Sequence, residues 1–253
     1  MMTIEQWHKG KVAVVTGGIS GIGRAVAEAL AQRGALVAVG ARRADQADLP
    51  GILALSLDVT DQGSVDNFIG NVTTRLGAPS ILVNNAGISV HRTVADHVDA
   101  DWLTVIDTNL NGPYRMIKAC LGPMKQSDWG RIVNVASTAA RTAEPTHAAY
   151  CASKSGLVGL TRAVALEGAP HGITCTTVSP TWVETQMLRE SAAKMAHRSG
   201  TTPEAEILGM AASNPQNRLV QPEEIAAMVS FLCSDHAPGL TMEDIQINAG
   251  AHW

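Results

Sequence analysis

Short apolar stretches alternate with longer amphipathic ones along almost the whole chain. The short stretches are rich in Val, Ile and Leu, as expected for strands that are buried on both faces. They predict strands over 12–15, 36–39, 52–59, 81–83, 131–135, 173–178 and 241–248. Between them, apolar residues at helical spacing predict helices over 24–33, 64–76, 101–120, 150–167 and 222–234. Such alternation predicts a doubly wound α/β fold, a mostly parallel seven-stranded sheet with helices on both faces.

The chain of 253 residues contains no change of composition and no low-complexity linker. This length suits one large domain, so we expect a single domain over residues 1–253. The segment 182–215 has few apolar repeats and contains Gly200 and Pro203. We interpret this segment as a mobile lid over a substrate site.

A glycine-rich turn joins the first predicted strand to the first predicted helix. It reads Thr16-Gly17-Gly18-Ile19-Ser20-Gly21-Ile22-Gly23. Glycines let the backbone turn tightly and approach a pyrophosphate, and the free N–H groups of the helix N-terminus favour an anion. A plain tight turn is the alternative. The position between strand and helix favours a dinucleotide-binding site.

Further polar and glycine residues follow other predicted strands, at the edge of the sheet where ligands bind in this fold class. They are Asp58, 84–87, Ser137 and 179–181. Tyr150 and Lys154 lie four residues apart in a predicted helix, so their side chains share one face. A nearby cation lowers the pKa of a phenol from about 10, which would suit proton transfer to an alcohol or ketone. Alone, the motif is weak evidence, because such a spacing occurs by chance in many helices as a surface pair.

These motifs together resemble the short-chain dehydrogenase/reductase family. The glycine turn is similar to the cofactor loop of that family, and Asn84-Asn85-Ala86-Gly87 is similar to its central structural motif. Asn109, Ser137, Tyr150 and Lys154 match its catalytic tetrad, with Ser137 thirteen residues before Tyr150. The resemblance covers nearly the whole chain and implies a Rossmann-type domain.

The resemblance implies hydride transfer between a nicotinamide cofactor and a ketone or secondary alcohol. Tyr150 would be the general acid, Lys154 would lower the Tyr150 pKa and hold the nicotinamide ribose, and Ser137 would bind the carbonyl oxygen. Asn109 would position a water in a proton relay. The implied cofactor contacts are Gly17, Ser20, Gly21, Ile22, Gly23, Asp58, Val59, Asn85, Ala86, Gly87, Tyr150, Lys154, Pro180, Thr181, Val183 and Thr185. A homotetramer, or at least a dimer, built through the helices that carry Asn109 and Tyr150 is also implied.

Two positions depart from the family pattern. Thr181 stands where relatives have glycine after the sixth strand, and Met242 stands where they commonly have glycine near the C-terminus. We expect Thr181 to reshape the wall near the nicotinamide, and Met242 to affect packing or subunit contact.

Three segments would line the substrate pocket by the same resemblance: 89–91, 141–147 and the lid. His91, His147 and Trp182 are our candidate substrate contacts. The alternatives are structural or solvated histidines and a tryptophan of the core. Arg141 could pair with an acidic substrate group or be solvated. Similarity to 3-oxoacyl, polyketide and 3-hydroxybutyrate-type members favours a 3-oxoacyl-type substrate.

The choice of cofactor depends on residues at the end of the second predicted strand. NAD sites place an acidic residue there, about 20 residues beyond the glycine turn. Here Arg42 and Arg43 occupy that window, and an arginine fork suits a phosphate. We favour NADP(H), with Arg42 as the main contact, and NAD(H) remains the alternative. Ser20 stands where many NADP-binding relatives carry a basic residue.

Composition excludes several other classes. The formal net charge is -4 without runs of like charge, so no nucleic-acid footprint is expected. No apolar run is long enough for a membrane span. The cysteines are widely spaced and the histidines lack metal-ligand spacing, which favours a metal-free protein with reduced thiols in the cytoplasm. A non-catalytic cofactor-binding regulator, or a structural subunit, remains the competing function.

Overall fold

The computed structural model describes residues 5–44, 47–143 and 145–251 of the chain. Seven parallel strands form one sheet in the order β3-β2-β1-β4-β5-β6-β7, which confirms the predicted doubly wound α/β fold. The strands are β1 Val12–Thr16, β2 Leu36–Ala41, β3 Leu53–Ser56, β4 Ile81–Asn84, β5 Gly130–Val135, β6 Ile173–Pro180 and β7 Asp244–Ile247. Strands β3 and β7 are shorter than their apolar patterns predicted.

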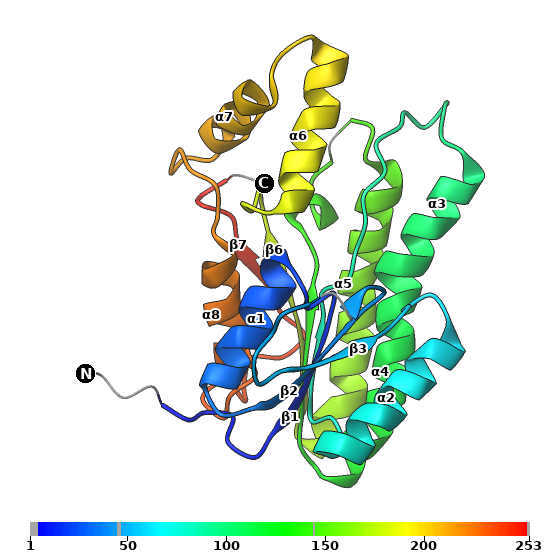
Figure 1. Ribbon diagram of the computed structural model, residues 1–253, viewed down its shortest axis with the longest axis vertical. Helices are drawn as coiled ribbons and strands as arrows, with labels where there is room; N and C mark the ends of the chain where they lie inside the picture. Colours follow the sequence, from blue (N-terminus) through cyan, green and yellow to red (C-terminus); the bar gives the residue numbers. More distant parts are fainter. Residues whose placement is uncertain (1–4, 45–46, 144, 252–253) are drawn as a thin grey trace.

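Helices cover both faces of the sheet (Figure 1). Helices α1 (Gly21–Gln32) and α8 (Pro222–Leu232) pack side by side on one face. Helices α2 (Gln62–Leu76), α4 (Gly112–Gln126) and α5 (Ala148–Gly168) cover the other face.

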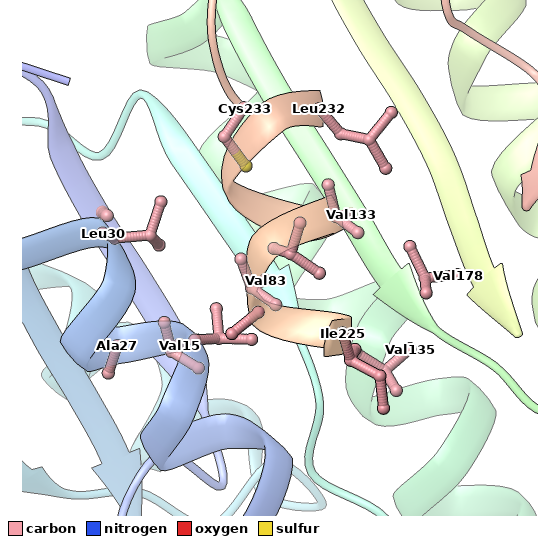
Figure 2. Close-up of a cluster of buried hydrophobic side chains, with 14 of the residues drawn as sticks. Val15, Ala27, Leu30, Val83, Val133, Val135, Val178, Ile225, Leu232 and Cys233 are labelled. Atoms are coloured by element: carbon pink, nitrogen blue, oxygen red, sulfur yellow. The ribbon is translucent and has the colours of Figure 1, made fainter. Parts of the chain in front are cut away.

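Successive side chains of a strand point to opposite faces of the sheet. Alternate residues of the strands therefore pack in two separate hydrophobic cores, one on each face. Val15 and Val83 face α1 and α8, where they meet Leu30 and Ile225 (Figure 2). The intervening Val14 joins the core beneath α2, α4 and α5. The sheet is therefore buried on both sides, which explains why its strands read as continuous apolar runs.

The helix predicted over 101–120 is interrupted. Helix α3 (Asp99–Ile106) passes through a π-turn at Asp107–Asn111 into α4. Such π-bulges are often found at functional sites, and this one carries the buried side chain of Asn109. A π-turn contains one residue more than an α-helical turn. The periodicity of the sequence did not reveal this insertion, because the apolar pattern resumes in α4.

The segment interpreted as a lid is largely helical. It contains α6 (Gln186–Ser199) and α7 (Pro203–Ser213), which extend beyond the sheet in Figure 1. Thr185 and Thr202 cap these helices through their side-chain oxygens, and Gly200 ends α6 in a left-handed conformation. A small apolar cluster of Leu188, Ala192, Met210 and Leu219 holds the two helices together. The few apolar positions of this segment serve that cluster, which is why the sequence did not predict helices there.

Strand β1 has β2 on one side and β4 on the other. Strands β2 and β3 are therefore added on one side of β1, and β4 to β7 on the opposite side. A crevice forms at such a switch point, outside the carboxyl ends of the strands.

No helix within the described ranges is long and apolar enough to cross a membrane.

Candidate active site

A cavity of ≈ 680 Å³ opens at the carboxyl ends of β1, β4, β5 and β6. Most of the predicted site residues line it: Gly17, Ser20, Gly21, Ile22, Asn85, Ala86, Gly87, His91, Ser137, His147, Tyr150, Lys154, Pro180, Thr181, Trp182, Val183 and Thr185. The cavity thus joins the glycine turn to the predicted catalytic residues.

The glycine turn has no room for side chains. Gly17 has φ +65°, and a Cβ there would lie 3.0 Å from the Cα of Ala86. A Cβ on Gly23 would lie 2.4 Å from both Asn85 Nδ2 and Gly17 O. Gly23, predicted as a cofactor contact, is buried behind the turn and does not line the cavity.

Asn85 and Thr16 hold the turn in place. Asn85 Nδ2 donates to the carbonyl oxygens of Thr16 (3.0 Å) and Gly17 (3.2 Å). In return, Thr16 Oγ1 accepts the backbone N–H groups of Asn85 and Ala86, both at 3.0 Å. Helix α1 begins at Gly21 with no acidic residue in its first turn, so its N-terminus is a favourable place for an anion. This cradle fits the pyrophosphate of a dinucleotide.

Tyr150 and Ser137 meet on the cavity wall. Ser137 follows β5, and its Oγ accepts the N–H of Ala139 at 3.1 Å, which fixes the side chain at the start of a short 3₁₀ turn. Burial raises the pKa of the half-buried Tyr150 phenol, while its hydrogen bond with the Ser137 side chain acts to lower that pKa. Tyr150 is therefore a protonated donor beside a hydroxyl group in this structure.

Lys154 lies one turn beyond Tyr150 on α5, as predicted, with Nζ 5.6 Å from the centre of the Tyr150 ring. Its Nζ donates to Val135 O at 2.7 Å, and burial lowers the pKa of the ammonium to about 8. The Tyr150 pKa is raised in this structure and not lowered as predicted, because burial of the phenol has the largest effect on it.

Asn109 belongs to the same cluster although its side chain does not line the cavity. Its Oδ1 accepts the N–H of Ile88 at 2.9 Å, and its Nδ2 donates to Ile88 O at 2.9 Å and Ser153 Oγ at 3.1 Å. Ser153 Oγ donates in turn to Tyr150 O at 2.8 Å. We did not predict this role of Ser153; its place between Tyr150 and Lys154 was the available signal. Asn109 thereby ties the loop after Gly87 to α5.

Comparison with known proteins agrees with this arrangement. Residues 17–252 match the profile of a family described as enoyl-(acyl carrier protein) reductase. A Streptomyces virginiae protein, named as a ketoacyl reductase of the monensin polyketide synthase, is 41% identical over 95% of this chain and 96% of its own length. A single-residue variant of the actinorhodin polyketide ketoreductase, solved with NADPH, is 34% identical with a TM-score of 0.89, covering 95% of this chain and 96% of that one. The ligand-free aldohexose dehydrogenase of Thermoplasma acidophilum is 30% identical with a TM-score of 0.91, covering 98% and 95%.

The chain belongs to the short-chain dehydrogenase/reductase family. It is an NAD(P)-dependent oxidoreductase, and its family supports the use of NADP(H). The competing function, a non-catalytic regulator or structural subunit, finds no support among the relatives. The described residues include no group of three or more His, Cys, Asp or Glu side chains placed to hold a metal ion.

The residues predicted at the adenosine end of this dehydrogenase/reductase site lie outside the cavity lining. Arg42 and Arg43 follow β2 and are exposed. The Asp58 carboxylate accepts the N–H and the hydroxyl of Thr60, and these bonds, with a smaller effect of Arg42, lower its pKa. Val59 is buried against Gly112: a Cβ on Gly112 would lie 2.8 Å from Val59 Cγ2. Arg42 and Asp58 are thus electrostatic neighbours, as one cofactor site would require.

On the substrate side, the predicted contacts come together. The ring centroids of His91 and His147 are 4.0 Å apart, and those of His147 and Tyr150 are 6.4 Å apart. Trp182 lines the cavity and also packs against the cluster that holds α6 and α7, so it serves as both wall and core. Thr181 lines the cavity too, and its Oγ1 donates to Asn214 Oδ1 at 3.4 Å.

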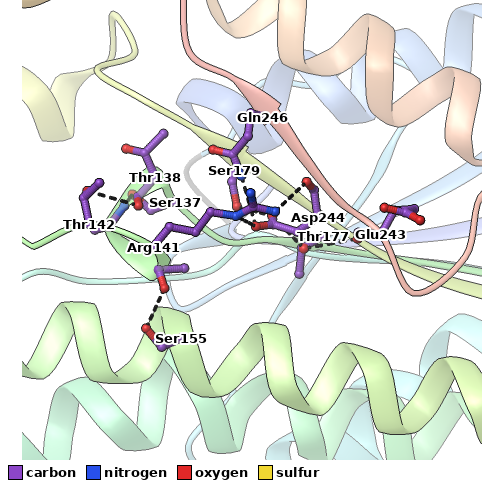
Figure 3. A network of polar contacts seen from close by, with 12 residues as sticks. Ser137, Thr138, Arg141, Thr142, Ser155, Thr177, Ser179, Glu243, Asp244 and Gln246 are labelled. Atoms are coloured by element: carbon purple, nitrogen blue, oxygen red, sulfur yellow. Dashed lines mark hydrogen bonds and ion pairs between the residues drawn. The ribbon is translucent and has the colours of Figure 1, made fainter. Parts of the chain in front are cut away.

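Arg141 does not reach the cavity. Its guanidinium pairs with Asp244 at 2.7 Å instead (Figure 3). The idea that Arg141 binds an acidic substrate group is therefore wrong for this structure. The partner belongs to β7, and only the tertiary fold brings it near.

Proposed function

We propose that this enzyme reduces the ketone of a 3-oxoacyl-type substrate, or oxidises the corresponding secondary alcohol, with NADP(H). The observation that carries the proposal is the convergence of Ser137, Tyr150 and Lys154 on the cavity that also contains the glycine turn. The bound nicotinamide would supply or accept the hydride. The roles of the protein are to orient the substrate and to move a proton.

In this proposal, Tyr150 is the general acid. Its raised pKa keeps the phenol protonated, and reduction of a ketone requires a proton at the forming alkoxide. Ser137 donates a hydrogen bond to the same oxygen, where negative charge develops. The substrate carbonyl would therefore lie between the two hydroxyl groups.

Lys154 would hold the nicotinamide ribose and return a proton to Tyr150. The pKa of about 8 lets this ammonium lose and regain a proton near neutral pH. We assign Asn109 a supporting role through Ile88 and Ser153, next to a water-mediated path for that proton. The glycine turn, Asn85 and Thr185 would bind the rest of the cofactor, with Arg42 and Arg43 on its 2′-phosphate.

The substrate class rests on the names of relatives, the monensin ketoacyl reductase and the actinorhodin ketoreductase. We propose that the segment 182–215, with α6 and α7, acts as the lid that encloses this substrate, because its residues line one side of the cavity. The rest of residues 1–253 would form the single domain that carries the site.

The experiment is a carbonyl panel with NADPH and NADH, read as nicotinamide absorbance, for wild type and Tyr150→Phe. The panel contains 3-oxoacyl thioesters, simple ketones and an aldohexose with NADP+. We expect turnover of the 3-oxoacyl compounds, and a fall of roughly 100-fold or more in Tyr150→Phe with cofactor binding intact. Turnover within about twofold of wild type would refute the role of Tyr150.

We also propose a homotetramer built through α4 and α5. Ala152, Ala163 and Leu166 form an exposed apolar stripe on α5, and Leu166 is 65% exposed. Tyr114 on α4 is exposed as well. Light scattering at micromolar concentration tests the assembly, and a monomer would contradict it.

The buried thiols of Cys120, Cys175 and Cys233 suit the reducing cytoplasm that we propose as the location of the enzyme.

A further inference from the structure

The cavity wall contains polar side chains that the proposed reduction does not use. Ser89 and His91 lie two residues apart on the loop after Gly87, and both line the cavity. Ser89 Oγ and His91 Nδ1 are buried and have no hydrogen-bond partner in the described part of the chain. Buried polar atoms are nearly always paired, so these two atoms are available to a ligand.

His147 completes this group. Its ring meets that of His91 at 66°, with the 4.0 Å separation given above. His147 Nδ1 lies 3.0 Å from Pro145 O, and a carbonyl only accepts, so Nδ1 carries the hydrogen and donates. Nε2 is therefore the ring nitrogen of His147 that remains for a contact with a ligand.

The backbone enforces the pairing of the two rings. Arg92 N donates to Thr146 O at 2.9 Å, which joins the loop after β4 to the loop before α5. Thr146 has φ +70°, an uncommon conformation for a β-branched residue. Strain of this kind persists where the surrounding structure enforces it, often at functional sites. Here it holds His147 against His91 on the cavity wall.

The charges around this group are positive. Burial lowers the pKa of His91 to about 4, and His147, Arg198 and Lys194 lower it further in that order. Arg198 also donates to His91 O at 3.4 Å. No acidic group acts on the His91 pKa among the described residues. An anion that entered here would be stabilised by these cations. Its negative charge would raise the pKa of the His91 imidazole and allow it to take up a proton.

We propose that Ser89, His91 and His147 form a subsite that binds the carboxylate of a short 3-oxo acid. The inference rests on the proposed function, which places the ketone of that acid at Ser137 and Tyr150. His147 is the neighbour of Tyr150 in this wall, and a single methylene group separates the ketone of a 3-oxo acid from its carboxylate. The ionised acid is thus the favoured form within the 3-oxoacyl class, since a neutral ester or thioester carbonyl gains less from the cations.

The test compares acetoacetate with its neutral analogue methyl acetoacetate, both with NADPH. We expect wild type to have the lower KM for acetoacetate. His91→Phe should raise that KM roughly 10-fold or more, the scale of one hydrogen bond to a charged group. The KM for the ester should stay within about twofold and kcat should change little. Equal changes for both substrates, or a wild type that prefers the ester, would overturn the subsite.

A variant series controls for structural effects. His171→Phe removes an imidazole that lies outside the cavity lining and should leave both KM values unchanged. His91→Gln keeps a polar side chain and should recover part of the affinity for acetoacetate. If His91→Gln and His91→Phe impaired both substrates equally, the role of His91 would be structural and the proposal would be wrong.

Calorimetry separates the subsite from the reduction itself. In the Tyr150→Phe protein with NADPH, acetoacetate should bind with uptake of a proton, measured in buffers of different ionisation enthalpy. The added His91→Phe substitution should abolish that uptake. If acetoacetate binds in this way but wild type does not reduce it, the subsite stands and the proposed function fails. If the ester is reduced while acetoacetate does not bind, the subsite is wrong and the proposed function stands.

Discussion

Arg141 Nε donates to Asp244 Oδ2 at 2.7 Å, although 103 residues separate them in the sequence. The Asp244 side chain is 2% exposed, and its other oxygen accepts the hydroxyl groups of Thr177 and Ser179 at the end of β6 (Figure 3). Gln246 Nε2 donates to Oδ2 at 3.0 Å. This one carboxylate therefore ties the loop that carries Ser137 to β6 and β7.

Replacing Asp244 with Ala should destabilise the protein by about 2–3 kcal/mol. Loss of one partner of a buried ion pair leaves the remaining polar groups unsatisfied, and the partial exposure of Arg141 reduces the penalty. Urea denaturation measures the change. Glu28→Ala, which breaks the exposed pair between Arg24 and Glu28, is the control and should cost under about 0.5 kcal/mol. Equal losses in the two variants would contradict the role of Asp244.

Met242→Gly should change the stability of the protein by less than about 1 kcal/mol. Met242 has φ +66° and is 37% exposed, so relief of the left-handed strain offsets the loss of the buried part of the side chain. The matched control is Gly172→Ala, at φ +65°, where a Cβ would lie 2.7 Å from Asp128 O. That control should destabilise by more than about 1 kcal/mol. Thermal denaturation of both variants gives the comparison, and a loss of more than about 1 kcal/mol in Met242→Gly would refute the strain argument.

Stability should fall as the pH drops from 6.5 towards 4. His8 is fully buried against Ser230, and burial lowers its pKa from 6.5 to about 4. Between these values the unfolded chain binds the proton and the folded chain does not, so the free energy of unfolding decreases by up to about 1.4 kcal/mol per pH unit. His91 acts in the same direction.

Urea midpoints across this pH range, for wild type and His8→Gln, provide the measurement. The slope with pH should become shallower in His8→Gln, because one of the two histidines of the described residues whose pKa is lowered by burial is gone. His197→Gln, on the exposed side of α6, should keep the slope of wild type. An unchanged slope in His8→Gln would show that His8 does not govern acid unfolding.

Arg42→Ala should weaken NADP(H) binding roughly 10- to 150-fold and leave NAD(H) nearly unchanged. A charge-assisted bond to a phosphate is worth about 1.5–3 kcal/mol, and the exposure of Arg42 favours the lower end of that range. Dissociation constants for both cofactors, from fluorescence titration, test this. Arg43→Ala should have a smaller effect with the same preference. A wild type that favours NAD(H), or a mutant that weakens both cofactors equally, would exclude NADP specificity through Arg42.

Local patterns in the sequence were sufficient for the sheet, the glycine turn and the Tyr150–Lys154 pair. Each depends on a short-range rule: apolar runs between helical stretches, glycines between strand and helix, and a spacing of four on one helix. The same rules placed Ser137 and the Asn85 motif at strand ends. Their meeting in one cavity then follows from parallel strands, whose carboxyl ends share an edge of the sheet.

Only the tertiary structure decided the charges and partners within that cavity. Desolvation sets the pKa values of Tyr150 and Lys154, and burial depends on segments that are distant in the sequence. The π-turn at Asn109 needs one extra residue that periodicity conceals, and the helices over 186–213 are held by a cluster too sparse to predict. The contacts of Arg141 with Asp244 and of His91 with His147 cross between separate elements. A sequence specifies such pairs only through the fold that brings them together.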